Sequence, residues 1–310
     1  MGKTCFFKYF ISNQRKSGVN MAYKKKKSFS AGKGLWYLLL VFLGFLATLA
    51  YQSLFQPAIN NPARYASGSL HRPGRRAVVI AGDDMVRGQI SFNYVEYLDQ
   101  KPDLQNFQFI NAGMNSDLSY NLLQRLGPIV ACRPAYIVIQ IGANDLIGSL
   151  YPKFADYFKV VKRIPNHPGL DSYSQNLALI VQNLQQNTKA QIALAGLPLM
   201  GESIHSAVNN QALKYNQVIQ AVAARQKVRF LPVYDRQVRY LMGSQRTSAS
   251  VYNGEYQQIG KALVEHLISK EDFDAIAFKN GYLLHTDGVH LNSRSGIMIA
   301  DEVEKFLKNQ

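Results

Sequence analysis

The sequence contains very little cysteine, and no acidic residue precedes Asp83. The 2 cysteines among 310 residues are Cys5 and Cys132. So few cysteines exclude a framework of disulfide bonds, and the sequence has no cysteine or histidine spacing typical of a metal site. We expect Cys132 to be a small buried apolar residue. With 47% hydrophobic residues, the chain is long enough for one sizeable α/β domain and an additional segment.

The positive charge is confined to the N-terminal part of the chain. Residues 1–82 contain thirteen Lys or Arg and no Asp or Glu, whereas residues 83–310 contain twenty-two basic and twenty acidic residues. The formal net charge of +15 therefore belongs almost entirely to the tail. A basic protein often binds nucleic acid, but the nearly neutral remainder offers no basic surface. We expect no nucleic-acid partner.

An uncharged apolar run follows the basic tail. Lysines occupy positions 24–27 and 33 before it, and no charge occurs between Lys33 and Arg64. As a helix, residues 35–55 would be roughly 31 Å long, close to the thickness of the hydrocarbon core of a bilayer. Aromatic residues lie near both ends, as in membrane-interface belts. The run predicts a single-pass anchor, with the N-terminus cytoplasmic and the main domain periplasmic or extracellular.

Two alternatives stay open for this segment. A cleaved signal peptide is the first, because small residues at 48–50 lie near a suitable cut. The apolar run is longer than the usual signal core of about 7–15 residues, which favours the anchor. The second concerns the start of the protein, since Met21 before the lysine cluster resembles an initiator and residues 1–20 would then be an upstream extension.

Short apolar runs alternate with amphipathic stretches from residue 77 onward. Continuous apolar runs predict strands that are buried on both faces, as in a parallel sheet covered by helices. Their alternation with helical stretches predicts a doubly wound α/β fold with right-handed crossovers. The expected strands are 77–81, 106–111, 136–141, 190–196 and 228–234. Residues 146–171 and 236–256 lack a clear period, which indicates substrate-side loops or small caps.

These patterns divide the chain into four parts. Residues 56–76 are rich in Pro, Gly, Asn, Ser and Arg without periodicity, and predict a linker that holds the domain off the membrane. The expected parts are a basic cytoplasmic tail over 1–34, a transmembrane anchor over 35–55, the linker over 56–76 and one domain over 77–310.

Four short polar motifs occur in the domain, and three of them lie at the ends of expected strands. In chain order they are Gly82-Asp83-Asp84-Met85, Asn111-Ala112-Gly113, Gly142-Ala143-Asn144-Asp145 and Asp287-Gly288-Val289-His290. Open α/β sheets bind ligands at the carboxyl ends of their strands, so we expect the motifs to converge. Taken singly, each motif is explained equally well by turn or helix-capping residues.

The residue types in these motifs suit an active site. Gly82 permits a sharp turn after its strand. The Gly113 N–H and the Asn144 amide are suitable donors to an oxyanion. Asp287 lies three positions before His290 and can orient its imidazole, as in a base–orienter pair.

The four motifs in this order resemble the SGNH/GDSL hydrolase family of esterases and lipases, whose first motif reads Gly-Asp-Ser-Leu. The resemblance covers about residues 77 to 308. It implies an SGNH hydrolase-like three-layer α/β/α sandwich with a parallel sheet and no cofactor or metal. By position it assigns Gly113 and Asn144 to the oxyanion hole, Asp287 and His290 to the base pair, Gly82 and Asp83 to structural roles near the site, and Asp84 to the place of the serine nucleophile.

Asp84 in place of serine changes the expected chemistry. A carboxylate is a poor nucleophile towards an ester carbonyl, and it brings negative charge to a hole built for an oxyanion. We expect a resting ion pair between Asp84 and His290 that fills this hole.

Three hypotheses follow, and the first is a hydrolase in which Asp84 attacks covalently or directs a water activated by His290. The second is a non-catalytic domain, a pseudoenzyme, that binds a glycan or lipid headgroup. In the third, Ser116 or Ser203 substitutes as nucleophile, although neither has the strand-to-helix setting of a nucleophile elbow. A metal held by Asp83 and Asp84 is disfavoured, because adjacent residues rarely both face one ion.

The sequence thus predicts a membrane-anchored, extracytoplasmic hydrolase. The family resemblance makes an ester bond in a small molecule, a carbohydrate or a lipid of the envelope the expected substrate, and the membrane the expected second partner. Non-catalytic binding is the alternative.

Overall fold

The computed structural model of the chain describes residues 31–245 and 251–309. The predicted basic tail over 1–34 lies almost wholly outside the described residues. Helix α1 spans Ala31–Phe55, but its side chains at 31, 32, 50 and 53–55 are also outside this description. Within the described part of the chain, no helix is sufficiently long and apolar to span a bilayer. The residues from Ala50 onward form one compact unit.

Five parallel strands form a single sheet in the order β2-β1-β3-β4-β5. The strands are β1 Arg76–Gly82, β2 Phe107–Gly113, β3 Tyr136–Gln140, β4 Gln191–Ala195 and β5 Arg229–Leu231. Strand β1 lies between β2 and β3, and its last residue, Gly82, pairs with Gly113 on one side and with Gln140 on the other. Chain order reverses at β1, which is where such sheets open a crevice for a ligand.

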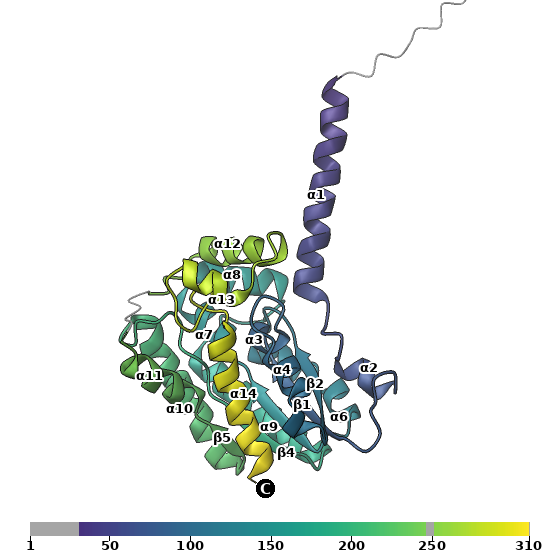
Figure 1. The fold of residues 1–310 in the computed structure, drawn as a ribbon, viewed down its shortest axis with the longest axis vertical. Helices are drawn as coiled ribbons and strands as arrows, with labels where there is room; N and C mark the ends of the chain where they lie inside the picture. The colour runs from purple at the N-terminus through teal and green to yellow at the C-terminus, as the bar shows by residue number, and fades with distance from the viewer. Residues whose placement is uncertain (1–30, 246–250, 310) are drawn as a thin grey trace, which may run out of the picture. The chain divides into compact units, whose positions relative to one another are not determined.

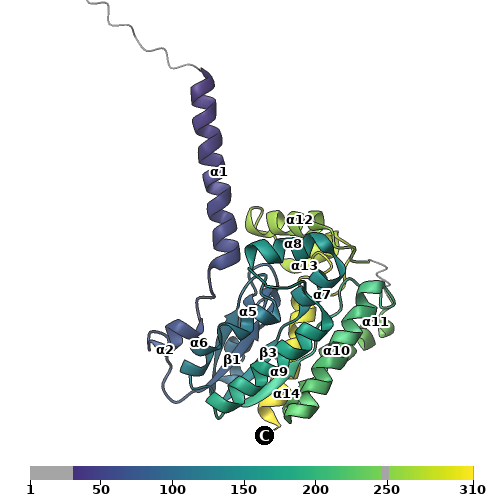
Figure 2. The same cartoon turned by 180° about the vertical axis from the view of Figure 1, so that it is seen from behind.

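Helices cover both faces of this sheet. Figures 1 and 2 show α4 and α14 on one face and α9 and α10 on the other. The expected α/β layering is therefore present. The remaining elements are α2 Pro62–Ala66, α3 Asp84–Arg87, α4 Tyr94–Gln100, the short 3-10 helix Pro102–Leu104, α5 Ser119–Leu123, α6 Leu126–Ala131, α7 Ala143–Leu150, α8 Pro152–Val161, α9 Leu170–Asn187, α10 Ala207–Gln226, α11 Val233–Gly243, α12 Tyr256–Leu267, α13 Phe273–Lys279 and α14 Ser293–Lys308.

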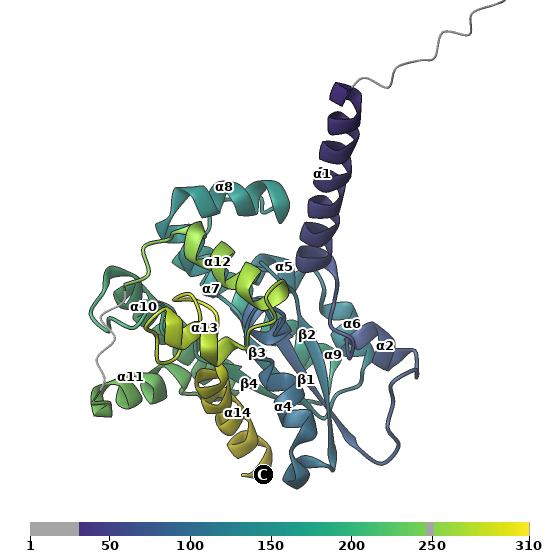
Figure 3. The ribbon, with the colours of Figure 1, turned by 45° about the horizontal axis from the view of Figure 1, so that its top comes forward.

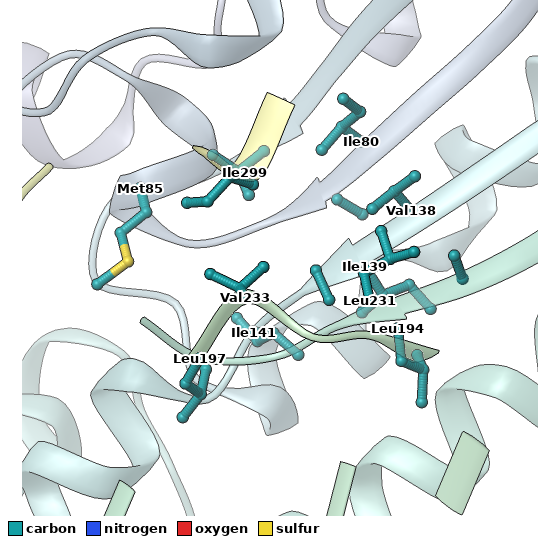
Figure 4. Close-up of a cluster of buried hydrophobic side chains, with 14 of the residues drawn as sticks. Ile80, Met85, Val138, Ile139, Ile141, Leu194, Leu197, Leu231, Val233 and Ile299 are labelled. Carbon is teal, nitrogen blue, oxygen red and sulfur yellow. The ribbon is translucent and has the colours of Figure 1, made fainter. Parts of the chain in front are cut away.

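The core is built from the continuous apolar runs of the strands. Ile80, Val138 and Leu194 come from three neighbouring strands and are fully buried, as is Ile299 of α14 (Figure 4). Burying a side chain of this size stabilises the fold by roughly 1.5–3 kcal/mol relative to exposure. Cys132 is also buried, as expected.

Residues 56–76, which were predicted as a linker, pack in part against the domain. They contain α2, which packs near α6 and β2, and Tyr65 is only 8% exposed. The Asn111 N–H donates to the Asn60 carbonyl oxygen at 3.0 Å, and the Gln108 side chain accepts from the Arg72 N–H at 2.8 Å. These polar, aperiodic residues therefore form part of the domain surface, because the edge strand β2 supplies partners for their backbone.

Candidate functional site

Asp84 stands at the end of the central strand, where β1 turns into α3. The turn requires Gly82, because a Cβ atom there would lie 2.0 Å from the Gln140 carbonyl oxygen of β3. Asp83 caps the short helix by accepting from the Met85 N–H at 3.2 Å. Gly88 ends the helix with φ at 65°, in the left-handed region that glycine tolerates. Tight packing around two glycines thus fixes Asp84 at the edge of the sheet.

Both oxygens of the Asp84 carboxylate accept a hydrogen bond. The Ser116 backbone N–H donates to Oδ1 at 2.9 Å, and the Asn144 side-chain amide donates to Oδ2 at 2.8 Å. A backbone N–H and an Asn amide aimed at one point are the donors expected of an oxyanion hole. Here they bind a side-chain carboxylate of the protein itself.

Ser116, rather than Gly113, supplies the backbone donor. The Gly113 N–H donates to the Asn111 side-chain oxygen at 2.9 Å, so it is turned away from Asp84. Gly113 is required by packing, since a Cβ atom there would lie 2.2 Å from the Arg87 backbone nitrogen. Ser116 has φ at 60°, and this conformation turns its N–H towards the site. The assignment of Gly113 to the oxyanion hole is therefore replaced by Ser116.

An ion-pair network holds the loop that carries Ser116. The buried Asp117 carboxylate lies 2.6 Å from the Arg125 side chain and 2.6 Å from Lys162 Nζ. Arg125 also donates to the Gly82 carbonyl oxygen at 3.0 Å, and the Asn144 amide donates to the Asp117 carbonyl oxygen at 3.1 Å. The two donors of the site are thus fixed to each other and to the end of β1. Sequence reasoning did not identify Asp117 or Arg125, because their pairing depends on the loop conformation.

Asp287 and His290 form the expected base–orienter pair. His290 Nδ1 lies 2.6 Å from Asp287 Oδ2, and Asp287 Oδ1 accepts from the His290 N–H at 2.9 Å. Both side chains are buried.

Burial disfavours the charged imidazole, but the charge and hydrogen bond of Asp287, with smaller contributions from Asp84 and Asp83, raise the pKa of His290 to about 9. Burial likewise opposes ionisation of Asp287, yet the charge and hydrogen bonds of His290 lower the pKa of Asp287 below its usual value. The pair therefore carries both charges at neutral pH.

Asp84, Asn144 and His290 line one cavity of about 230 Å³. The predicted convergence of the first, third and fourth motifs is confirmed by this geometry. The expected Asp84–His290 ion pair is absent from the ion pairs of the described residues, in which His290 pairs with Asp287. Asp84 instead fills the donor pair made by Ser116 and Asn144.

Most of the remaining cavity wall is apolar and aromatic. Helices α8 and α12 lie together at one end of the domain (Figure 3) and are joined by stacking of Phe154 on Tyr256, with ring centroids 4.1 Å apart. The Tyr157 hydroxyl lies 3.2 Å from Ser116 Oγ. The aperiodic stretch 146–171 thus supplies a cavity wall, as its length suggested. Other apolar lining residues are Ile90, Ile147, Phe158, Ile259 and Leu263.

The remaining candidate residues have other surroundings. Asp83 is buried, and burial together with the charge of Asp84 raises its pKa well above the ordinary value. Its position below the turn fits the structural role predicted for it. Ser203 is not among the residues that line the cavity, whereas Ser116 is. Within residues 31–245 and 251–309, no group of three or more His, Cys, Asp or Glu side chains could hold a metal ion.

Comparisons with known proteins identify the family of the chain and its fold. A family model described as GDSL-like lipase/acylhydrolase matches residues 81–294. The crystal structure of Axe2, an acetylxylan esterase from Geobacillus stearothermophilus, is 16% identical and superposes with a TM-score of 0.51, covering 77% of this chain and 97% of that chain. An acetyl xylan esterase, AlAXEase, is also 16% identical, with a TM-score of 0.51 and coverage of 74% and 99%. At a sequence identity of 16%, this structural similarity establishes the fold alone. No curated protein matches the chain.

Proposed function

The chain belongs to the GDSL-like lipase/acylhydrolase family, and from this premise we propose that its domain hydrolyses ester bonds in acylated carbohydrates or lipids of the cell envelope. The observation that carries the proposal is the shared cavity of Asp84, Asn144 and His290. It is lined by a base that Asp287 orients from behind, by the two residues that supply the donors, and by an apolar wall suited to an acyl group. Acetylated carbohydrate is the favoured class, since both superposed structures are named as acetylxylan esterases.

In this proposal Asp84 takes the position of the family serine, and a water molecule replaces the serine hydroxyl as nucleophile. The neutral form of His290 removes a proton from this water while Asp287 stabilises the resulting imidazolium. Asp84 accepts the second hydrogen of the water and orients it. Because Asp84 occupies both donors, the ester oxyanion competes with a carboxylate for them. Loss of one such donor typically costs ~10²–10³ in rate, so we expect slow turnover by the native chain.

A second function is favoured by the same occupied donors. A carboxylate bound to the Ser116 N–H and the Asn144 amide resembles the state that an esterase reaches with its oxyanion already in place. Such a site binds a ligand in the apolar cavity without turning it over. A non-catalytic domain that binds a glycan or lipid headgroup is therefore the competing function.

Hydrolysis of p-nitrophenyl acetate by four forms of the full-length chain separates the two functions. Under the hydrolase proposal the wild type is active and His290→Ala is inactive. Asp84→Ser is faster than the wild type, because without the carboxylate the Ser116 N–H and the Asn144 amide are free to bind the ester oxyanion. Ser203→Ala, outside the cavity, retains wild-type activity. Wild-type turnover no higher than that of a folded His290→Ala variant contradicts the hydrolase and supports the binding domain.

We also propose that residues 35–55 anchor the chain in the cell membrane, with the N-terminus cytoplasmic and the domain outside. Support comes from the uncharged run that follows the lysines and forms much of α1. Large apolar side chains along this helix are exposed, among them Leu38 at 68% and Val41 at 70%. An anchor of this kind would hold the cavity close to envelope substrates.

A further inference from the structure

The donors of this site bind the side chain that stands at the nucleophile position. In a serine hydrolase such donors bind the substrate's oxygen, because the carbonyl that becomes tetrahedral belongs to the substrate. Here each oxygen of Asp84 accepts one hydrogen bond, at 2.9 Å from the Ser116 N–H and 2.8 Å from the Asn144 amide. This arrangement suits a reaction in which the carbonyl that becomes tetrahedral belongs to Asp84.

We propose that the cavity opens epoxides: Asp84 attacks a saturated ring carbon to form an aspartyl ester, and water activated by His290 hydrolyses that ester. A carboxylate attacks a saturated carbon more readily than an ester carbonyl, and the ring strain of an epoxide makes that carbon reactive. This activity goes beyond the ester hydrolysis proposed above and does not depend on it.

Tyr157 is placed to assist ring opening. Its hydroxyl lies 3.2 Å from Ser116 Oγ, and the Ser116 N–H binds Asp84, so the phenol and the carboxylate flank the same residue. Burial raises the pKa of Tyr157, and the charge of Asp84 raises it further, while the hydrogen bond with Ser116 lowers it. The phenol is therefore neutral and able to donate. As the Asp84 oxygen bonds to carbon, the ring C–O bond breaks and the ring oxygen takes the phenolic proton. The products are a hydroxyalkyl ester of Asp84 and the Tyr157 phenolate.

The second step uses the His290–Asp287 pair. Neutral His290 takes a proton from water, and the resulting hydroxide attacks Cγ of the Asp84 ester. One Asp84 oxygen is the carbonyl oxygen of the ester. It keeps its hydrogen-bond donor when the addition of hydroxide converts it into an oxyanion. The bond between Cγ and the ester oxygen then breaks, and the leaving alkoxide takes the proton from His290. The Asp84 acid proton returns to the phenolate, so that epoxide and water give a vicinal diol.

Esterification of Asp84 also prepares His290 for this step. The negative charge of Asp84 is one of the causes that raise the pKa of His290. An ester carries no charge, so the imidazole becomes a base at lower pH once the intermediate has formed. The charge state of the pair thus changes in the direction that the reaction requires.

The wall of the cavity selects the kind of epoxide. Its volume is about 230 Å³, and among the described residues that line it no Lys or Arg occurs. Phe154 and Phe158 come from α8, and Ile259 and Leu263 come from α12. A neutral epoxide with one aromatic or short aliphatic substituent fits this lining, and styrene oxide is a suitable probe.

The test incubates the full-length chain and its variants with styrene oxide and measures the diol by chromatography. The wild type is expected to form diol, Asp84→Asn none, and Tyr157→Phe at least tenfold less. Tyr240→Phe, on α11 and outside the cavity lining, is the matched control and keeps full activity. His290→Ala, or Asp287→Asn if the first variant loses its circular dichroism, is expected to accumulate the ester, seen as a mass increase of the peptide that contains Asp84.

A single turnover in water labelled with a heavy oxygen isotope identifies the mechanism. The expected diol is unlabelled, because its new oxygen comes from Asp84, and the label appears in Asp84. The inference is overturned by absence of diol with the wild type, by undiminished diol formation with Asp84→Asn, or by label in the first diol. Ester hydrolysis without epoxide opening overturns this inference alone. Epoxide opening without ester hydrolysis overturns only the proposed function.

Discussion

A carboxylate at position 84 changes the function of its neighbours. With serine there, the Ser116 N–H and the Asn144 amide would be free for a substrate oxyanion. With aspartate, each donates to an Asp84 oxygen instead. His290 is affected as well, because the nearby negative charges favour its imidazolium form. One substitution thus removes the serine nucleophile, fills the hole and adds to the negative charges that favour a protonated His290.

The charge on His290 predicts the pH dependence of ester hydrolysis. Its pKa of about 9 means that the imidazolium dominates at neutral pH and the basic form appears as pH rises through that value. We expect the rate to increase roughly tenfold per pH unit below this value and then to level off. In Asp84→Asn the loss of a negative charge lowers the pKa of His290, so the midpoint moves to lower pH. Initial rates across the pH range test this, and an unchanged midpoint in Asp84→Asn contradicts it.

At the scale of elements, the end of β2 is positioned by its contact with α3. A Cβ atom on Gly113 would lie 2.2 Å from the Arg87 backbone nitrogen, whereas one on Gly127 in α6 would meet nothing within 4 Å. Overpacking of this kind typically costs about 1–3 kcal/mol. We expect Gly113→Ala to lower the free energy of unfolding by that amount.

Gly127→Ala is the matched control, since alanine at an open helical position is neutral or stabilising by up to about 1 kcal/mol. Urea unfolding of both variants gives the comparison. Equal stability of the two would show that the close approach of β2 and α3 is relaxed in solution.

The strands were predictable from the sequence, and some elements were not. Continuous apolar runs located all five strands, because strands buried on both faces have this pattern. The last strand is shorter than the expected 228–234, since Pro232 ends it and α11 follows. Helix α2 within residues 56–76 has no periodicity to indicate it. Its contacts come from the edge of the sheet.

The candidate site was also predictable only in part. Asp84, Asn144, Asp287 and His290 were found because their chemistry resides in side chains. The backbone donor was missed, since a glycine was expected and Ser116 adopts positive φ without any signal in its residue type. Tyr157 was missed because its relation to Ser116 arises only when α8 lies beside the loop that carries Ser116.

At the scale of the whole chain, the membrane anchor gives a direct prediction. The full-length protein is expected in the membrane fraction and should remain there after alkaline carbonate washing. A chain that begins at residue 56 should be soluble, and it must keep residues 56–76 because they pack on the domain. A mature N-terminus near residues 48–50, determined by mass spectrometry, contradicts the anchor and supports a cleaved signal peptide.

The convergence of distant motifs is tested most directly by labelling with a fluorophosphonate, which reacts with a serine activated by a neighbouring histidine and oxyanion donors. Mass spectrometry of the digested Asp84→Ser variant is expected to find the label at position 84, with none in the Asp84→Ser, His290→Ala double variant and none in the wild type. An unlabelled but folded Asp84→Ser variant would contradict the shared site of Asp84, Asn144 and His290. Label on Ser116 or Ser203 of the wild type would contradict position 84 as the place of the nucleophile.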